Sequence, residues 1–207
     1  MRIVVTGATS FIGLAVIENL LHGGHEVLAV ARPDSPGRKK LEGRKGIRIL
    51  TCGLDHIGNL TDPLVLAGRP DGPGGSGAAR GADAWLHLGW EGAGSANRQN
   101  PQLQARNIGY ALESLRTAAA IGCTRFLFSG SQAEYGIYRT VMKEDGVCSP
   151  VSEYGKDKLE VCRRASEEAE RLGITYIHAR IFSVYGPGDH PWSLVSTCID
   201  TFLRGGH

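Results

Sequence analysis

Short apolar runs and longer helix-like segments alternate along almost the whole chain, and this alternation constrains its fold more than any other feature. Strands and helices that alternate at this length predict a parallel sheet covered by helices on both faces. Right-handed connections between the strands then favour a doubly wound α/β fold. The apolar runs predict β-strands at residues 3–5, 27–31, 47–50, 84–88, 126–129 and 175–181, and amphipathic patterns predict α-helices at residues 11–22, 102–121, 153–172 and 192–203.

The first predicted strand runs into the first predicted helix through a short turn that is typical of phosphate binding. Gly7 can form the tight turn, Gly13 can let the helix pack closely on the strand, and Ser10 can cap the helix. Because free N–H groups at a helix N-terminus bind phosphate oxygens, we predict a dinucleotide site here. An ordinary strand-to-helix turn is the alternative. The candidate cofactor-binding residues are Gly7, Thr9, Ser10, Phe11, Ile12 and Gly13.

The end of the second predicted strand bears on the choice between NAD and NADP. An acidic residue at this place binds the ribose 2′-hydroxyl of NAD, but this sequence has Arg32. A guanidinium matches the geometry of the 2′-phosphate that distinguishes NADP. We therefore favour NADP as the cofactor and keep NAD as the alternative. A solvated basic loop is the ordinary explanation of such a charge cluster, which continues at residues 38–40.

Tyr154 and Lys158 lie four residues apart near the start of a predicted helix, a spacing that places both side chains on one face. A nearby ammonium favours the phenolate, so we expect Lys158 to lower the pKa of Tyr154 from about 10. Tyr154 can then pass a proton to or from an alcohol or sugar oxygen while hydride moves. Ser131 follows the fifth predicted strand, at the sheet edge where ligands bind, and can hydrogen-bond the reacting oxygen. An exposed Tyr–Lys pair and a Ser/Gly-rich turn are the ordinary alternatives.

Five segments, in their order along the chain, resemble the extended short-chain dehydrogenases. This family includes nucleotide-sugar epimerases, dehydratases and ketoreductases. The segments are TGATSFIG, HLGW, FSGSQAEYG, YGKDK and ARIFSVYGPG, which begin at residues 6, 87, 128, 154 and 179. The resemblance implies a Rossmann fold and a catalytic triad of Ser131, Tyr154 and Lys158, of which the tyrosine and the lysine also contact the cofactor.

The same resemblance implies roles for residues outside the triad. Asn107 corresponds to an asparagine that is structural and relays a proton. His87, Leu88 and Gly89 correspond to a loop beside the cofactor ribose. Ile181 begins a segment, residues 181–187, that borders the nicotinamide and the substrate.

The sequence departs from the family pattern at several places. Ser10 stands where the family usually has its middle glycine. Gly53 stands where an aspartate that contacts adenine is common, and Asp55 is the candidate substitute. Gln132 and Ala133 stand where the 4,6-dehydratases have acidic residues, which disfavours that reaction, and Glu134 receives no such role.

Family members continue well beyond residue 207 into a C-terminal substrate-binding domain. We therefore expect a dinucleotide-binding domain at residues 1–185 and only the beginning of a truncated substrate-binding region at residues 186–207. The apolar residues of the last predicted helix then lack a partner, so we expect the chain to associate, for example as a homodimer. Residues 68–82 are rich in glycine and predict a surface loop.

Composition narrows the classes of function. The net charge of +2, from 23 basic and 21 acidic residues, gives no electrostatic basis for binding nucleic acid or an anionic membrane. The sequence lacks a stretch of about 18 apolar residues that could span a membrane. Five cysteines without CxxC spacing predict neither a disulfide framework nor a metal site. We expect a cytoplasmic protein.

These observations favour an enzyme that uses NAD(P) to epimerise or to reduce a nucleotide-activated sugar, by hydride transfer with a tyrosine as acid and base. Two alternatives remain open at this point. One is an NADP-dependent reductase of a small non-sugar carbonyl compound. The other is a dinucleotide-binding redox sensor without catalytic activity, against which the Ser131–Tyr154–Lys158 set argues, because a sensor does not need a triad.

Overall fold

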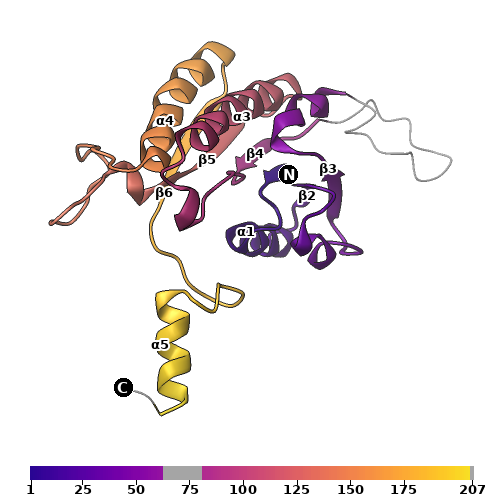
Figure 1. Cartoon of the computed structure of the whole chain (residues 1–207). Helices are drawn as coiled ribbons and strands as arrows, with labels where there is room; N and C mark the ends of the chain where they lie inside the picture. The colour runs from indigo at the N-terminus through magenta and orange to yellow at the C-terminus, as the bar shows by residue number, and fades with distance from the viewer. Residues whose placement is uncertain (63–80, 206–207) are drawn as a thin grey trace.

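A six-stranded parallel sheet forms the centre of the computed structural model, which describes residues 1–62 and 81–205 (Figure 1). The strands follow the order β3-β2-β1-β4-β5-β6, in which the chain returns to the middle of the sheet between β3 and β4. This order confirms the doubly wound Rossmann fold predicted from the sequence. The strands are β1 (Arg2–Thr6), β2 (Glu26–Ala31), β3 (Ile47–Thr51), β4 (Ala84–His87), β5 (Arg125–Ser131) and β6 (Thr175–Ile181).

The long helices begin at side-chain caps. Ser10, Asn100, Ser152 and Ser193 each accept a hydrogen bond from a backbone N–H in the first turn of the following helix. Gly173 ends α4 in the left-handed conformation, with φ at 66°. The α-helices are α1 (Phe11–His22), α3 (Pro101–Ala120), α4 (Glu153–Leu172) and α5 (Leu194–Leu203), and short 3-10 helices are η1 (Pro36–Lys40), η2 (Leu54–Thr61), η3 (Ser95–Asn97) and η4 (Gln132–Glu134).

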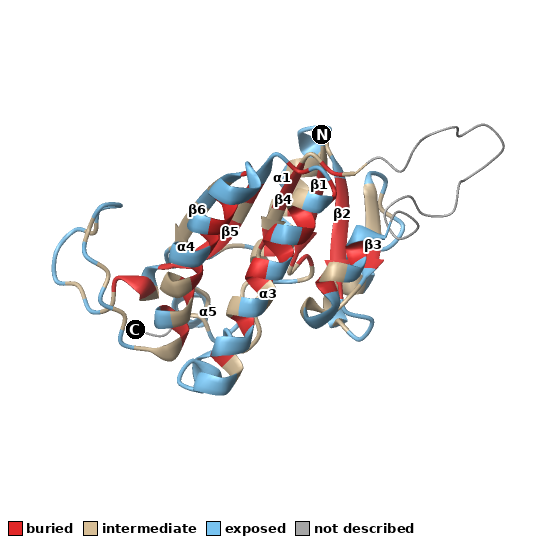
Figure 2. Cartoon of the chain, turned by 90° about the horizontal axis from the view of Figure 1, so that it is seen from above, coloured by how far each residue is buried: buried red, intermediate tan, exposed pale blue. Residues whose placement is uncertain are grey.

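Alternate residues of the central strands separate two hydrophobic cores. In β1, Val4 packs into the core shared with α3 and α4, whereas Ile3 and Val5 pack into the core shared with α1. Trp85 of β4 is fully buried in the first core, and Ile17 of α1 is fully buried in the second. Figure 2 shows the strands buried between the helices, with α3 and α4 turning one buried face toward the sheet.

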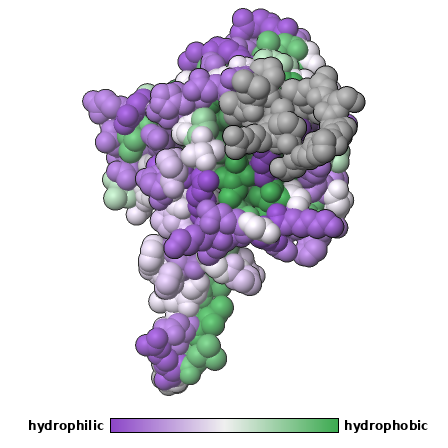
Figure 3. All heavy atoms as spheres, turned by 90° about the vertical axis from the view of Figure 1, so that its right-hand side faces the viewer, coloured by the Kyte–Doolittle hydropathy of each residue, from purple (hydrophilic) through white to green (hydrophobic). Residues whose placement is uncertain are grey.

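The C-terminal helix α5 stands apart from the sheet and its covering helices (Figure 1). Its large apolar side chains are mostly solvent-exposed: Leu194, Ile199, Phe202 and Leu203. They give the green stripe along one side of the projecting helix in Figure 3. The predicted helix at residues 192–203 therefore exists but begins at Leu194, after its cap at Ser193.

Two further sequence predictions concern a loop and the end of a strand. Most of the loop predicted at residues 68–82 lies outside the described residues. The fourth strand, predicted to reach residue 88, ends at His87, where the chain turns into the candidate site.

Among the described residues, the helices are too short or too polar for any of them to cross a membrane.

Candidate active site

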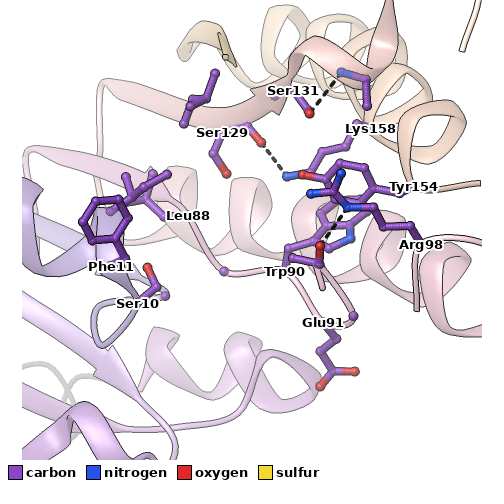
Figure 4. A pocket seen from close by; sticks show the side chains of 18 of the residues that line it. Ser10, Phe11, Leu88, Trp90, Glu91, Arg98, Ser129, Ser131, Tyr154 and Lys158 are labelled. Carbon is purple, nitrogen blue, oxygen red and sulfur yellow. Dashed lines mark hydrogen bonds between the residues drawn. The ribbon is translucent and has the colours of Figure 1, made fainter. Parts of the chain in front are cut away.

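A large cleft opens at the carboxyl ends of the strands, between the start of α1 and the start of α4 (Figure 4). Its volume is about 1280 Å³. Pockets for single drug-sized ligands measure roughly 300–1,000 Å³, so this cleft has room for a dinucleotide and a second molecule. Of the predicted site residues, the cleft is lined by Gly7, Thr9, Ser10, Phe11, Ile12, Arg32, Leu88, Gly89, Ser131, Tyr154, Lys158 and Ile181.

Close backbone contacts shape the turn after β1. Gly7 has a φ of +65°, and a Cβ atom there would lie 2.7 Å from the backbone N of Gly89, after β4. A Cβ atom on Gly13 would lie 2.2 Å from the carbonyl oxygen of Gly7. Both positions therefore require glycine, as the sequence pattern predicted. Gly13 supports the turn from behind and does not itself line the cleft.

The start of α1 presents backbone donors to the cleft. Ser10 caps the helix by accepting a hydrogen bond of 3.0 Å from the N–H of Gly13, which leaves Phe11 and Ile12 in the first turn facing the cleft. First-turn N–H groups have no partner within their helix and bind phosphate oxygens well. Thr9 is linked to Ser35 by a 2.6 Å hydrogen bond between their hydroxyls, so the turns after β1 and β2 are joined.

The turn after β2 supplies a cation at the same end of the cleft. Arg32 lines the cleft with its side chain 60% exposed and its Nε atom 3.8 Å from a carboxylate oxygen of Asp34. Asp55, the predicted adenine contact, does not line the cleft, and its carboxylate lies 3.3 Å from His56. Cys52 and Leu54 line the cleft in its place, and the sequence pattern did not single them out.

Ser131, Tyr154 and Lys158 come together on the opposite wall, as predicted. Ser131 ends β5, and the other two side chains project from the first two turns of α4 (Figure 4). The buried Lys158 ammonium donates a 2.5 Å hydrogen bond to the carbonyl oxygen of Ser129. It also lies 4.1 Å from the centre of the Trp90 ring and 5.6 Å from that of Tyr154. Burial lowers the pKa of Lys158 to about 7, although Glu134 partly opposes this shift.

The protonation of Tyr154 differs from the sequence prediction. Burial raises the pKa of Tyr154 above its ordinary value, and Glu134 adds to the rise. A hydrogen bond with Ser131 and the charge of Arg98 oppose burial but do not outweigh it. The phenol is therefore protonated near neutral pH in the structure. The YxxxK spacing placed Lys158 beside the ring correctly, but it carries no information about how deeply the ring is buried.

A cluster around the buried carboxylate of Glu134, formed with the partly buried His178 and Arg180, fixes the backbone of Ser131. Glu134 accepts hydrogen bonds from the Ser131 N–H at 2.7 Å and from Arg180 at 2.8 Å, and it contacts His178 at 2.9 Å. Burial acts to raise the pKa of Glu134, but these partners lower it below its ordinary value. Arg180 also donates to the hydroxyl of Tyr135 and to the backbone oxygen of Glu144. The sequence pattern missed this cluster because Glu134 lies more than 40 residues before His178 and Arg180.

Asn107 lies behind the cleft and does not line it. Its carbonyl oxygen accepts a 2.7 Å hydrogen bond from the N–H of Glu91, and its amide donates to the backbone oxygens of Glu91, Leu103 and Gln104. Gln104 holds the same loop by accepting from the Trp90 indole at 2.7 Å and donating to two backbone oxygens. The structural part of the predicted Asn107 role thus has a physical basis, and the proton relay stays a prediction.

His87 also lies beneath the cleft and does not form part of its wall. The ring is buried between Phe126 and Phe128, with its Nδ1 atom 3.1 Å from the hydroxyl of Thr6. Burial, with the charge of Lys158, lowers the pKa of His87 to about 3, so the ring is neutral. In the HLGW segment it is Leu88, Gly89 and the following tryptophan that reach the cleft.

Comparison with known proteins identifies the family. The model of the NAD dependent epimerase/dehydratase family matches residues 3–207. The chain belongs to this family. The chain is 28% identical over 200 residues to one curated relative, an uncharacterized UDP-glucose epimerase, YtcB, from Bacillus subtilis. It is 26% identical over 155 residues to dTDP-6-deoxy-L-talose 4-dehydrogenase (NAD(+)) from Aggregatibacter actinomycetemcomitans.

Solved structures agree with this membership of the epimerase/dehydratase family. MoeE5 in complex with UDP-glucose and NAD is 27% identical and superposes with a TM-score of 0.77 over 99% of this chain. A UDP-glucose 4-epimerase from Thermotoga maritima, 24% identical with a TM-score of 0.80, shares the fold. The chain spans 62% and 64% of these two structures, 59% of YtcB and 50% of the talose dehydrogenase.

Proposed function

We propose that this chain carries the cofactor-binding and catalytic half of an NAD(P)-dependent epimerase or 4-ketoreductase that acts on a nucleotide-activated sugar. One observation carries the proposal: Ser131, Tyr154 and Lys158 line the same cleft as the phosphate-binding start of α1. A protonatable phenol, a hydroxyl and an ammonium beside a dinucleotide site are the groups that acid–base-assisted hydride transfer requires.

The donor groups of the cleft suit a dinucleotide. Backbone N–H groups at Phe11 and Ile12 can receive its phosphates, Arg32 can pair with a ribose phosphate, and Lys158 lines the cleft beside Tyr154. When bound, the nicotinamide supplies the hydride acceptor and donor. Relatives named above bind or use NAD, whereas Arg32 favours NADP, and we propose NADP as the preferred cofactor with NAD as the alternative.

Tyr154 carries the proton in this proposal. When an alcohol carbon of the sugar loses its hydride, the hydroxyl proton passes to Tyr154 in its ionised form, the phenolate, and a carbonyl forms. In the reverse direction Tyr154 returns the proton as hydride is added back. Ser131 holds the reacting oxygen, since its own backbone is fixed by Glu134. Lys158, tethered to Ser129, adds positive charge near the ring.

The likeness to MoeE5, solved with UDP-glucose and with UDP-glucuronic acid, supports a nucleotide sugar as substrate. The cleft offers further lining groups for such a molecule: Gln132, Tyr138, Met142, Phe182 and His190. A small non-sugar carbonyl substrate is the second candidate. Turnover of UDP- and dTDP-linked 4-keto sugars, compared with that of simple ketones, separates the two.

Replacement of Tyr154 by phenylalanine tests the proposal directly. Tyr154→Phe removes the proton donor and leaves the ring, so we expect turnover of a nucleotide sugar to fall by about 10²–10⁴-fold. Cofactor affinity, measured by calorimetry, should stay close to that of the parent. Tyr110→Phe, which removes a phenol outside the cleft, is the control. Near-parental turnover of Tyr154→Phe would show that the chemical centre lies elsewhere and would favour a non-catalytic dinucleotide sensor.

A further inference from the structure

Arg98 places a second cation against the ring of Tyr154. Its guanidinium carbon lies 4.9 Å from the ring centre, closer than the Lys158 nitrogen at 5.6 Å. Arg98 lines the cleft and is exposed, and Figure 4 shows its guanidinium beside the Tyr154 ring. The sequence motifs did not include this residue, because it lies 56 positions before Tyr154 in the loop between β4 and α3.

Two hydrogen bonds hold this segment against the start of α4, and a third orients the Arg98 side chain. The backbone oxygen of Arg98 accepts a 3.0 Å bond from the N–H of Tyr154. The side-chain oxygen of Gln99 accepts a 3.3 Å bond from the N–H of Glu153. The Nε atom of Arg98 donates a 2.9 Å bond to the backbone oxygen of Ala93, which fixes the direction of the guanidinium. The cation is therefore oriented before any ligand binds.

The two cations near Tyr154 are not equivalent. The Lys158 ammonium is committed to the carbonyl oxygen of Ser129 and lies over the rings of Trp90 and Phe128. The guanidinium of Arg98 uses only its Nε atom, and among the described residues its two terminal nitrogens have no hydrogen-bond partner. The guanidinium can therefore interact with a negative charge that develops on Tyr154.

The other groups that face Tyr154 do not cancel an influence of Arg98 on its pKa. From β5, Ser131 forms a hydrogen bond that lowers the pKa of Tyr154. From η4, the carboxylate of Glu134 acts in the opposite direction, but the guanidinium of Arg180, 2.8 Å from this carboxylate, already neutralises much of its charge. Burial is the largest influence and disfavours the phenolate. The charge of Arg98 opposes burial, and an oriented cation at this distance commonly shifts a neighbouring acid by one or more pH units.

We propose that Arg98 stabilises the negative charge on Tyr154 and thereby sets the pH range in which the proton is transferred. This role rests on the proposed function of Tyr154, through which Arg98 acts. The prediction is that Arg98→Gln shifts the ionisation of Tyr154 upward by about one pH unit, the lower end of the usual range because Arg98 is exposed. At a pH below the midpoint, this shift reduces the phenolate fraction about tenfold, and with it the turnover in the direction that oxidises the alcohol.

An ultraviolet difference titration tests this without any substrate. The chain has six tyrosines, so each spectrum is compared with that of the same protein carrying Tyr154→Phe, and the difference reports Tyr154 alone. The set comprises the parent, Arg98→Gln, Arg98→Lys and Arg163→Gln. Arg163 is an exposed residue of α4 paired with Glu160 and Glu167, and its replacement removes the same charge far from these contacts.

The expected pattern is an upward shift in Arg98→Gln, recovery of most of it in Arg98→Lys and an unchanged midpoint in Arg163→Gln. The pH profile of turnover should shift in parallel. An unchanged Tyr154 midpoint in Arg98→Gln overturns the inference, and so does an equal shift in Arg98→Gln and Arg98→Lys, since charge would then not be the cause. Failure of the proposed function is distinguishable, because it appears as unaltered turnover in Tyr154→Phe.

Discussion

Burial of the Lys158 ammonium places a charged group in the candidate site but lowers the stability of the fold. It is 2% exposed, and within the part of the chain that the structure describes its ammonium has one hydrogen bond, to Ser129, and aromatic rings around it. Removing an ammonium from water costs several kcal/mol unless partners compensate it fully. The lowered pKa of Lys158, about 7 through burial, is the signature of incomplete compensation.

We predict that Lys158→Met abolishes turnover but stabilises the protein near neutral pH. The unfolded chain, with a lysine pKa near 10.5, binds more protons than the folded chain between pH 7 and 10.5. The free energy of unfolding of the parent therefore rises with pH across this window, by up to about 1.4 kcal/mol per unit. The free energy of unfolding of Lys158→Met does not depend on pH in this way. Its excess in stability over the parent is therefore largest below pH 7 and disappears toward pH 10.5.

Urea unfolding at a series of pH values measures this difference, with Lys156→Met as the control. Lys156 lies on the same helix, but it is exposed and paired with Glu153 at 2.7 Å. Its replacement should change stability little and equally at each pH. Parallel pH dependence in the parent and in Lys158→Met would contradict the prediction.

Arg32 decides the cofactor in our proposal. Arg32→Asp replaces the cation that can pair with the 2′-phosphate of NADPH by an acid that can accept from the 2′-hydroxyl of NADH. We expect weaker NADPH binding and retained NADH binding, measured by isothermal titration calorimetry of both cofactors. Arg38→Asp, in the same basic loop but paired with Glu42, is the control. Tighter binding of NADH than of NADPH by the unmutated protein would refute the preference for NADP.

At the scale of elements, the turn from β1 into α1 has the least freedom to change. Gly7 approaches the chain after β4, and Gly13 approaches Gly7. Thr6, at the end of β1, accepts a 3.2 Å hydrogen bond from the N–H of Gly89. The turn from β1 into α1, which we propose binds phosphate, is therefore packed directly against the turn that follows β4, and a shift in one moves the other.

We predict that Gly13→Ala destabilises the protein by about 1–3 kcal/mol and weakens dinucleotide binding, because its Cβ would lie 2.2 Å from a backbone oxygen. Gly109→Ala is the matched control. Gly109 lies in α3, and a Cβ there meets no atom within 4 Å. Alanine should instead stabilise that helix by about 0.8–1 kcal/mol. Chemical unfolding and calorimetry with NAD(P)H measure both effects, and equal behaviour of the two variants would contradict the close contact at Gly13.

The same elements show how far sequence reasoning reaches. The bounds of α1, α4 and β6 follow from local signals, such as the Ser10 and Ser152 caps and the left-handed Gly173. Ser131, Tyr154 and Lys158 could be placed together because the sheet edge collects the ends of the strands. The Glu134–His178–Arg180 cluster and the contact of Arg98 with Tyr154 could not, since each joins segments distant in sequence. Burial, which decides the pKa of Tyr154 and hides His87, likewise has no local signal.

At the scale of the molecule, the sheet and the projecting helix differ in how completely their apolar surfaces are covered. The sheet order places the cleft where the chain reverses direction, between β1 and β4. Helix α5, by contrast, presents exposed apolar side chains to solvent (Figure 3). Such surfaces mark association sites in soluble proteins.

We predict that the chain associates through α5, with a homodimer as the expected form. Ile199 and Phe202 are 54% and 68% exposed and lie three residues apart on one helix face. The double substitution Ile199→Ser and Phe202→Ser should weaken association at least tenfold, because burial of one such side chain contributes about 1.5–3 kcal/mol. Sedimentation equilibrium over a range of concentrations measures it, with Thr201→Ser as the control. A monomeric parent at all concentrations would contradict the prediction.

The position of Trp90 has a practical consequence. The chain has three tryptophans: Trp85 is fully buried in the core, Trp192 is 76% exposed, and Trp90 forms part of the cleft wall. The Trp90 ring meets Tyr154 edge-on at 5.8 Å and lies under the Lys158 ammonium. Its ultraviolet emission therefore depends on the charge and packing at the chemical centre. In a protein that keeps only this tryptophan, the candidate active site carries its own fluorescent label, and ligand entry can be followed in real time without a dye.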